Sequence, residues 1–97
     1  MVAGLIYNRH SLPAHVKDYV WDYDFTTDEI LNVDWQEQYC VDWLKKNIKP
    51  GENLNLYVTG LTQALVSMIN ACHQLNVPLI LWHYDRSAHD YYKQVVK

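Results

Sequence analysis

The fold is decided by the segment Asn55–Tyr84, which reads NLYVTGLTQALVSMINACHQLNVPLILWHY. Its pattern predicts an apolar strand, a tight Thr-Gly-Leu-Thr turn at 59–62, an apolar helix and a second apolar strand. A strand that passes through a glycine turn into a helix points backbone N–H groups and the positive end of the helix dipole at one place. We therefore expect an anion to bind at this turn, although the turn matches neither a Walker motif nor a dinucleotide-binding motif.

Length and composition place the chain among small globular proteins. It has 97 residues, of which 49% are hydrophobic and 20% charged, so we expect residues 1–97 to form a single domain. The net charge of −3 argues against binding to long DNA or RNA, because such proteins neutralise several phosphates with a basic face. A small phosphorylated ligand is compatible with this charge, since a local group of backbone amides suffices to bind it.

The cysteines and the N-terminal segment indicate the cellular compartment in which the protein is expected. Cys40 and Cys72 form no CxxC pair and lie in apolar helical patterns, which predicts two buried, reduced thiols and a cytoplasmic protein. The segment Met1–Tyr7 lacks the basic start and long apolar run of a signal peptide, and no apolar run approaches the ~18 residues of a membrane span. We expect no membrane partner and no cofactor.

Strands and helices alternate along the chain, which predicts a mostly parallel sheet. The segment 21–25 alternates aromatic and acidic residues and suits an edge strand, and the last strand is expected to return antiparallel. The sequence therefore predicts an α/β fold, namely a single compact Rossmann-like domain with helices on both faces of the sheet. We expect strands at 2–7, 21–25, 54–59, 78–84 and 91–96, and helices at 12–20, 34–48 and 61–75.

Capping residues and apolar faces refine this prediction. Thr26 with Glu29 forms a capping-box pattern, and Asp34 with Glu37 forms a similar pattern at the start of the helix 34–48. The helix 61–75 carries apolar residues almost all round, which indicates burial on two sides. Either a further chain segment or a partner chain can supply the second cover, and we expect a homodimer.

Polar residues follow three of the expected parallel strands. Asn8-Arg9-His10 follows the first strand, the turn at 59–62 follows the third, and His83-Tyr84-Asp85-Arg86 closes the fourth. Because parallel strands end at the same edge of a sheet, we expect these groups to converge on one ligand site. The expected ligand-binding residues are Asn8, Arg9, Thr59, Gly60, Leu61, Thr62 and Asp85.

Simpler structural roles remain open for these residues. Gly60 can serve only the turn, and Thr59 or Thr62 can merely cap the helix. Arg86 can pair with a neighbouring aspartate on the surface, where such pairs contribute little. The histidines can be ordinary surface residues.

Two other kinds of site receive less support from the sequence. His83 and Asp85 point to the same face of a strand and His10 can approach them, but a fourth ligand is missing, so no metal is expected. The tyrosines near the C-terminus are expected to pack on the core or on a dimer partner rather than to stack on bases. These tyrosines are Tyr84, Tyr91 and Tyr92.

Three features together are typical of a known group of proteins. The first strand ends in a polar turn with a histidine (5–10), a tryptophan-bearing helix begins near Trp35, and a strand leads through a Gly/Thr turn into a helix (56–62). In these features the chain resembles the small CRISPR-associated Rossmann-like proteins of antiviral defence, namely CARF-type domains and the single-domain ring nucleases related to them.

The resemblance implies a homodimer that binds a cyclic oligoadenylate across its two-fold axis, with two 59–62 turns holding phosphates. It also implies metal-independent cleavage, in which a ribose 2′-hydroxyl attacks the neighbouring phosphate and leaves a cyclic phosphate. In that reaction Arg9 or Arg86 stabilises the phosphorane, and His10 or His83 protonates the leaving oxygen. The expected catalytic residues are therefore His10, His83 and Arg86.

Two alternatives belong to other functional classes. One is a non-catalytic binding protein, of phage or prophage type, that sequesters a nucleotide signal or masks a partner protein. The other is a dimeric structural module without a small ligand. The same group of phosphate-binding amides serves binding and cleavage, so the sequence leaves these alternatives open.

Overall fold

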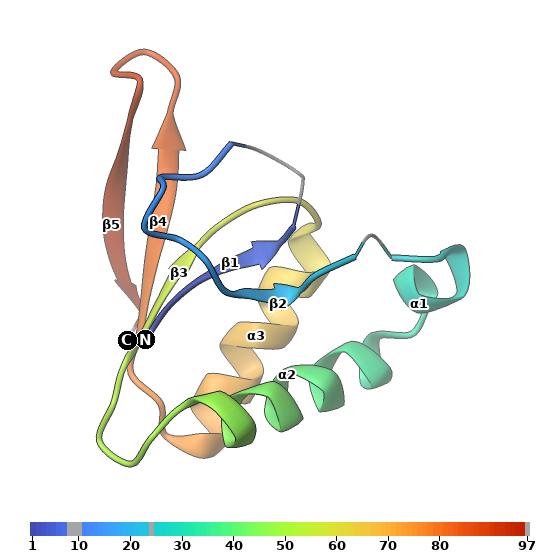
Figure 1. The fold of residues 1–97 in the computed structure, drawn as a ribbon. Helices are drawn as coiled ribbons and strands as arrows, with labels where there is room; N and C mark the ends of the chain where they lie inside the picture. The colour runs from blue at the N-terminus through green and yellow to red at the C-terminus, as the bar shows by residue number, and fades with distance from the viewer. Residues whose placement is uncertain (8–10, 24, 97) are drawn as a thin grey trace.

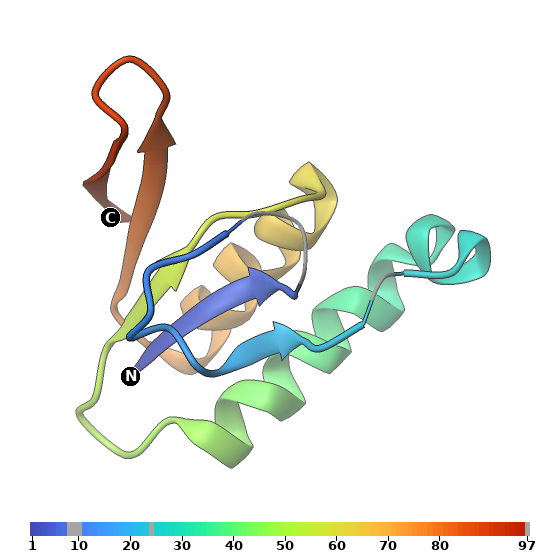
Figure 2. The same ribbon diagram turned by 45° about the horizontal axis from the view of Figure 1, so that its top comes forward.

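The computed structural model describes residues 1–7, 11–23 and 25–96. Figures 1 and 2 show one sheet, with the two longer helices side by side against it. The strands are β1 (Val2–Ile6), β2 (Tyr19–Trp21), β3 (Leu54–Tyr57), β4 (Leu79–Asp85) and β5 (Asp90–Val96). The helices are α1 (Thr27–Leu31), α2 (Val33–Asn47) and α3 (Thr62–Leu75).

The five strands lie in the order β2-β1-β3-β4-β5. The first four are parallel, and β5 runs antiparallel to β4, which confirms the mostly parallel sheet with an antiparallel last strand. Strands β1 and β3 are direct neighbours, with Gly4 opposite Tyr57. The parallel pairing of these two strands brings their carboxyl ends to the same edge of the sheet.

The expectation of helices on both faces is not confirmed. Helices α2 and α3 belong to crossovers that run in the same direction along the sheet, and right-handed crossovers of this kind lie on one face. The connection from β1 to β2 runs in the opposite direction, and its described part, residues 11–18, contains a turn but no helix. In residues 11–18 an irregular segment therefore stands where a Rossmann-like fold has part of a helix.

The predicted helix at 12–20 is wrong. A single turn forms, in which Val16 N donates to Pro13 O at 2.9 Å. The chain then joins the sheet, because Gly4 N donates to Asp18 O at 2.9 Å, and strand β2 begins at Tyr19. The edge strand exists, but it begins two residues before the predicted segment 21–25 and ends at its first residue.

The hydrophobic core lies between the sheet and the two helices. Side chains alternate along β3, so Leu54 and Leu56 are fully buried in this core while Asn55 and Tyr57 face the other side. Cys40 and Cys72 are free and buried in the same core, as predicted. None of the helices in the described ranges is long and apolar enough to cross a membrane.

The opposite face of the sheet carries an aromatic cluster. Tyr57 stacks on Trp82 with ring centroids 5.8 Å apart, and Tyr91 meets Tyr57 in an edge-to-face arrangement with ring centroids 5.0 Å apart. The Tyr57 hydroxyl lies 3.2 Å from His15 Nε2, so the connection 11–18 covers part of this face. Tyr91 therefore packs inside the chain, as expected for a C-terminal tyrosine. Tyr84 and Tyr92 remain exposed.

The helix starts were predicted with mixed success. The capping box at Thr26 is confirmed: Glu29 N donates to Thr26 Oγ1 at 3.3 Å, and Thr26 N donates to Glu29 Oε1 at 2.8 Å. Helix α2 begins at Val33 rather than Asp34, because Asn32 Oδ1 caps it by accepting from Trp35 N at 3.0 Å. Asn32 ends α1 and starts α2, which leaves no separate cap at Asp34.

Candidate functional site

The strand order creates a switch point between β1 and β3. From β1 the chain moves to β2 on one side, and it later returns to β3 on the other side. Ligands of open parallel sheets bind at such points, beyond the carboxyl ends of the strands. The turn at 59–62 lies at this edge. Asn8, Arg9 and His10, which follow β1 in sequence, lie outside the described residues.

Thr59 joins the two strands at the switch point. Its hydroxyl accepts a hydrogen bond from Ile6 N and donates one to Ile6 O, both at 3.0 Å. The side chain is only 1% exposed, so both hydrogen bonds are shielded from water. Thr59 neither caps the helix nor presents its hydroxyl to a ligand. Its role is to hold the ends of β1 and β3 together.

The glycine of the turn is required by the backbone. Gly60 has φ +78°, in the left-handed region that side chains with a Cβ avoid. The next residue, Leu61, returns to an extended conformation and occupies the N-cap position of α3. The simpler role considered for Gly60 is therefore supported, since it permits the turn that redirects the chain from β3 into α3.

The start of α3 lacks the capping that the other helices have. Thr26 caps α1 and Asn32 caps α2, whereas Leu61 offers no side-chain acceptor and the first turn of α3 has no acidic residue. The first backbone N–H groups of a helix have no partner within the helix, and anions bind to such groups. Thr62 is exposed in this first turn and adds a hydroxyl.

The neighbouring residues tie the start of α3 to the helical layer. The Gln63 side-chain amide donates to Ile30 O, and the amide of Gln36 donates to the same carbonyl at 3.1 Å. Gln36 is fully buried, so its hydrogen bonds to Glu29 O and Ile30 O, which tie α2 to α1, are shielded from water. The first turn of α3 is therefore held in a defined position next to the switch point.

The site residues expected at the end of β4 do not lie at the start of α3. Figures 1 and 2 show the β4–β5 hairpin projecting away from the start of α3. His83 forms a 2.9 Å hydrogen bond with Gln94 Oε1 of β5, and Arg86 lies exposed in the hairpin turn. Asp85 Oδ1 accepts from Ser87 N at 2.9 Å, as in many tight turns. In the described residues these side chains serve the hairpin.

Metal and thiol chemistry find no support in the described ranges. There, no three or more His, Cys, Asp or Glu side chains gather as metal ligands do. Burial raises the pKa of the Cys72 thiol to about 12, and burial together with the nearby Cys72 raises the pKa of Cys40 further. Both side chains are therefore neutral thiols at pH 7 and poor nucleophiles.

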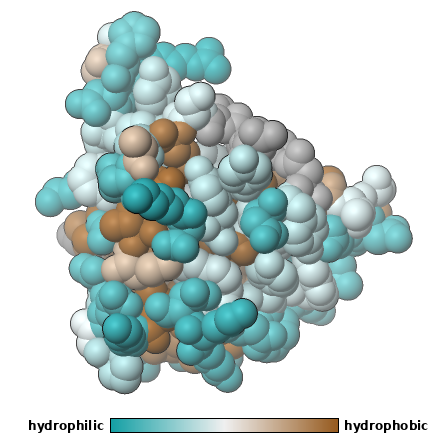
Figure 3. Space-filling model, viewed as in Figure 1, coloured by the Kyte–Doolittle hydropathy of each residue, from teal (hydrophilic) through white to brown (hydrophobic). Residues whose placement is uncertain are grey.

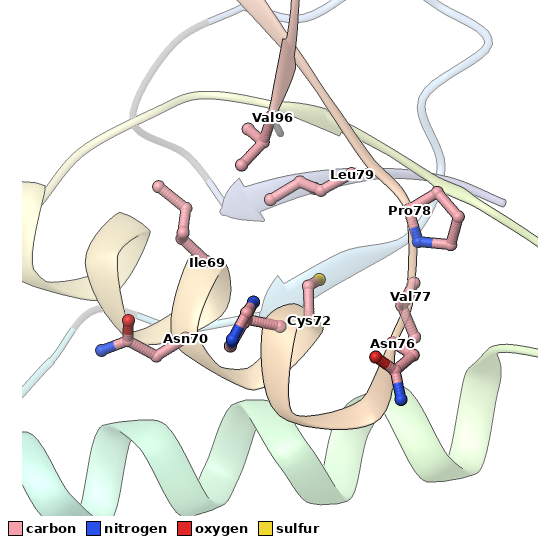
Figure 4. Close-up of a pocket in the computed structure, with 9 residues that line it drawn as sticks. Ile69, Asn70, Cys72, Asn76, Val77, Pro78, Leu79 and Val96 are labelled. Atoms are coloured by element: carbon pink, nitrogen blue, oxygen red, sulfur yellow. The ribbon is translucent and has the colours of Figure 1, made fainter.

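A cavity of about 360 Å³ lies at the other end of α3 and was not expected from the sequence (Figure 4). Its walls include Ile69 and His73 of α3, Leu79 of β4 and Val96 of β5. It therefore lies at the amino ends of the parallel strands, whereas ligands of this fold class bind at their carboxyl ends. We assign the candidate site to the 59–62 turn for this reason.

Comparison with models of known protein families, with curated proteins and with solved structures finds no match for this chain. The functional assignment therefore depends on the geometry of the edge formed by β1, β3 and α3. That geometry is an uncapped helix start beside a switch point, with the two strands locked together by Thr59.

Proposed function

We propose that this domain binds a cyclic oligoadenylate or a related nucleotide at the carboxyl ends of β1 and β3. The supporting observation is that α3 begins at the switch point without a capping side chain. A ligand phosphate there accepts hydrogen bonds from the first-turn N–H groups and meets the positive end of the helix dipole. The exposed Thr62 hydroxyl donates a further hydrogen bond.

Thr59 and Gly60 have supporting roles in the proposed site. Thr59 keeps the ends of β1 and β3 at a constant separation through its two hydrogen bonds to Ile6. Gly60 leaves the backbone uncovered where a phosphate approaches. Because the net charge is −3, affinity depends on local amides rather than on a basic face, and binding falls only gently with added salt.

Binding without cleavage is the form of this function that the described residues favour. A general acid has to lie within hydrogen-bond reach of the leaving oxygen. His83 is hydrogen-bonded to Gln94 on the hairpin, and Arg86 lies in the hairpin turn. A cleaving enzyme would depend on Arg9 and His10, which follow β1 in sequence. We therefore propose a protein that sequesters a nucleotide signal, with ring-nuclease activity as the second candidate.

Thr62→Asp tests the phosphate site. An aspartate in the first turn stabilises the helix start through the dipole, but its negative charge repels a bound phosphate. We expect the variant to fold at least as stably as the wild type and to bind about tenfold more weakly, which corresponds to about 1.4 kcal/mol. Isothermal titration with cyclic oligoadenylates of several ring sizes and with AMP measures the affinity.

Thr27→Asp is the matched control, because Thr27 is an exposed threonine at the first position of α1. It should leave the affinity unchanged. The proposal fails if the wild type binds none of these nucleotides, or if Thr62→Asp binds as tightly as the wild type. Chromatography of nucleotide incubated with the protein separates the two candidates: intact rings support sequestration, whereas linear products that His10→Ala abolishes support cleavage.

A further inference from the structure

The outer edge of the sheet is formed by β5. This strand pairs with β4 without interruption from Leu79 opposite Val96 to Asp85 opposite Asp90. Within the described ranges no strand lies on its other side. Seven residues at about 3.3 Å each make this edge roughly 23 Å long, and the backbone N–H and C=O groups of alternate residues point away from β4. Among the backbone groups of this strand, Tyr91 N donates to the side chain of Asp90 at 2.7 Å.

This edge has only part of the usual protection against pairing. Natural edge strands are kept short, bulged, interrupted by proline or provided with charged side chains, lysine above all. Strand β5 has the sequence DYYKQVV, with two charged residues, Asp90 and Lys93, but without proline or bulge, whereas β2 at the other edge has only three residues. Tyr92 and Val95 are each 55% exposed. The composition is that of a strand with a partner.

The surroundings leave room for a partner strand. The β4–β5 hairpin extends past the helical layer in both ribbon views (Figures 1 and 2). In Figure 3, hydrophilic residues cover the hairpin tip, and hydrophobic residues are visible lower on that side of the molecule. On the helical side, Val96 of β5 lines the cavity of Figure 4 together with Ile69 and His73 of α3.

We propose that β5 pairs antiparallel with β5 of a second copy of this chain, so that the two sheets become one continuous sheet. The charge pattern of β5 across a two-fold axis favours a second copy as the partner. Directly opposite residues of an antiparallel pair lie on the same face of the sheet. The two-fold axis therefore passes between the two copies of one residue. An axis at Lys93 would place the two Lys93 side chains opposite each other, and an axis at Asp90 would do the same for the two aspartates. Both arrangements bring like charges together.

An axis at Tyr92 avoids both repulsions. It places Tyr92 opposite Tyr92, Lys93 opposite Tyr91, and Asp90 opposite Gln94. Each charged side chain then meets an aromatic or amide group to which it can donate or from which it can accept, and the exposed tyrosines cover one another. Axes at Tyr91 and Gln94 also avoid these repulsions, but the axis at Tyr92 is the one that places the two exposed Tyr92 side chains, each 55% exposed, against each other.

The proposed dimer does not rest on the nucleotide site, but it bears on that site's stoichiometry. Five inter-strand spacings of about 4.8 Å separate the two β3 strands in the joined sheet, which is roughly 24 Å. Each copy therefore holds its own ligand beside its own Thr62, and the expected ratio is one ligand per chain. A ligand shared across the two-fold axis would give half that ratio.

Two variants that introduce opposite charges at Tyr92 test the dimer. We expect the wild type to have twice the mass of one chain by light scattering. Tyr92→Glu and Tyr92→Lys should each associate at least tenfold more weakly, because like charges then oppose across the axis, and an equimolar mixture should dimerise again. Val66→Glu is the control, since Val66 is 47% exposed on α3 and should leave the dimer intact.

Circular dichroism confirms that each variant is folded. A monomeric wild type at micromolar concentration overturns the proposal, and so does a dimer that both Tyr92 variants preserve. A dimer broken by Val66→Glu but not by the Tyr92 variants assigns the interface to α3 and equally overturns it.

Cysteine substitution tests the register. Tyr92→Cys places the two cysteines opposite each other, about 5 Å apart between Cα atoms, where a disulfide forms. Val95→Cys introduces a cysteine of equal exposure on the same strand, but the register separates the two copies by six residues, or roughly 20 Å. On a non-reducing gel we expect cross-linked dimer for Tyr92→Cys only. Efficient cross-linking of Val95→Cys instead would overturn the register.

Discussion

Thr59 illustrates how much depends on one hydroxyl. Its two hydrogen bonds to the backbone of Ile6 link residues that are 53 positions apart in the sequence. Both partners are buried, so removal of the hydroxyl leaves an N–H and a C=O without water to replace it. The same side chain sets the separation of β1 and β3 at the candidate ligand site.

Replacement of Thr59 by valine keeps the shape of the side chain and removes both hydrogen bonds. We expect Thr59→Val to lower the free energy of unfolding by about 2–4 kcal/mol, as measured by urea denaturation, because two buried polar groups lose their partner. Thr59→Ser retains the hydroxyl and should cost clearly less. Equal losses in the two variants would show that the methyl group, which only Thr59→Ser removes, contributes as much as the two hydrogen bonds, and a loss confined to Thr59→Ser would contradict the prediction.

At the scale of elements, the junction of α1 and α2 shows how capping orders a short helix. Helix α1 has five residues and no fully buried side chain, although Ile30 packs partly against the core. Its start is stabilised by the capping box, in which Glu29 accepts from Thr26 N, and by the Tyr23 hydroxyl, which donates to Glu29 at 2.9 Å. These contacts favour the charged form of the carboxylate.

This junction predicts a pH dependence. The backbone hydrogen bond from Thr26 and the hydroxyl of Tyr23 hold the pKa of Glu29 below its ordinary value of 4.5. Because the folded pKa is lowered, the contribution is present above pH 4.5 and is lost as the pH falls through the folded pKa. Glu29→Gln keeps a capping-box residue without a titrating group. We expect urea denaturation of this variant to show a smaller loss of stability on acidification.

Glu52 provides the comparison for that experiment. The hydrogen bond from Lys49 N lowers the pKa of Glu52 as well, so the pKa values of both glutamates lie below the ordinary value. Glu52→Gln should also reduce the acid sensitivity, and the double variant should reduce it further. An unchanged pH profile in Glu29→Gln would mean that the capping box contributes equally in both protonation states.

At the scale of the whole molecule, the proposed β5 pairing links folding to association. A chain of 97 residues buries a modest core, and a partner strand adds burial that the single chain cannot supply. Anything that binds only the folded state raises its stability by mass action, and a second copy acts in this way.

Thermal unfolding should therefore depend on protein concentration. We expect the midpoint of the wild type to rise with concentration, because dimerisation stabilises the folded chain, and the midpoint of Tyr92→Glu to rise less over the same range. Differential scanning calorimetry over a hundredfold range of concentration measures both. A constant midpoint in the wild type would contradict the dimer independently of its register.

Local patterns determined most of the elements. The helices α2 and α3 and the strands β3, β4 and β5 follow from apolar periodicity, and Gly60 from its place between a strand and a helix. The alternation of these elements also determined that the sheet is mostly parallel, since such a chain requires crossovers. These features depend on residues close together in the sequence, which is why the sequence alone predicts them.

Only the tertiary structure decided the rest. The segment 12–20 has a helical pattern, yet hydrogen bonds from β1 draw its end into the sheet as β2. The hydroxyl of Thr59 serves Ile6 rather than the helix, and the β4–β5 hairpin carries His83 and Arg86 away from the start of α3 (Figures 1 and 2). Each outcome is set by backbone groups or strands distant in sequence, because buried polar groups take the partner that the assembled sheet brings within reach.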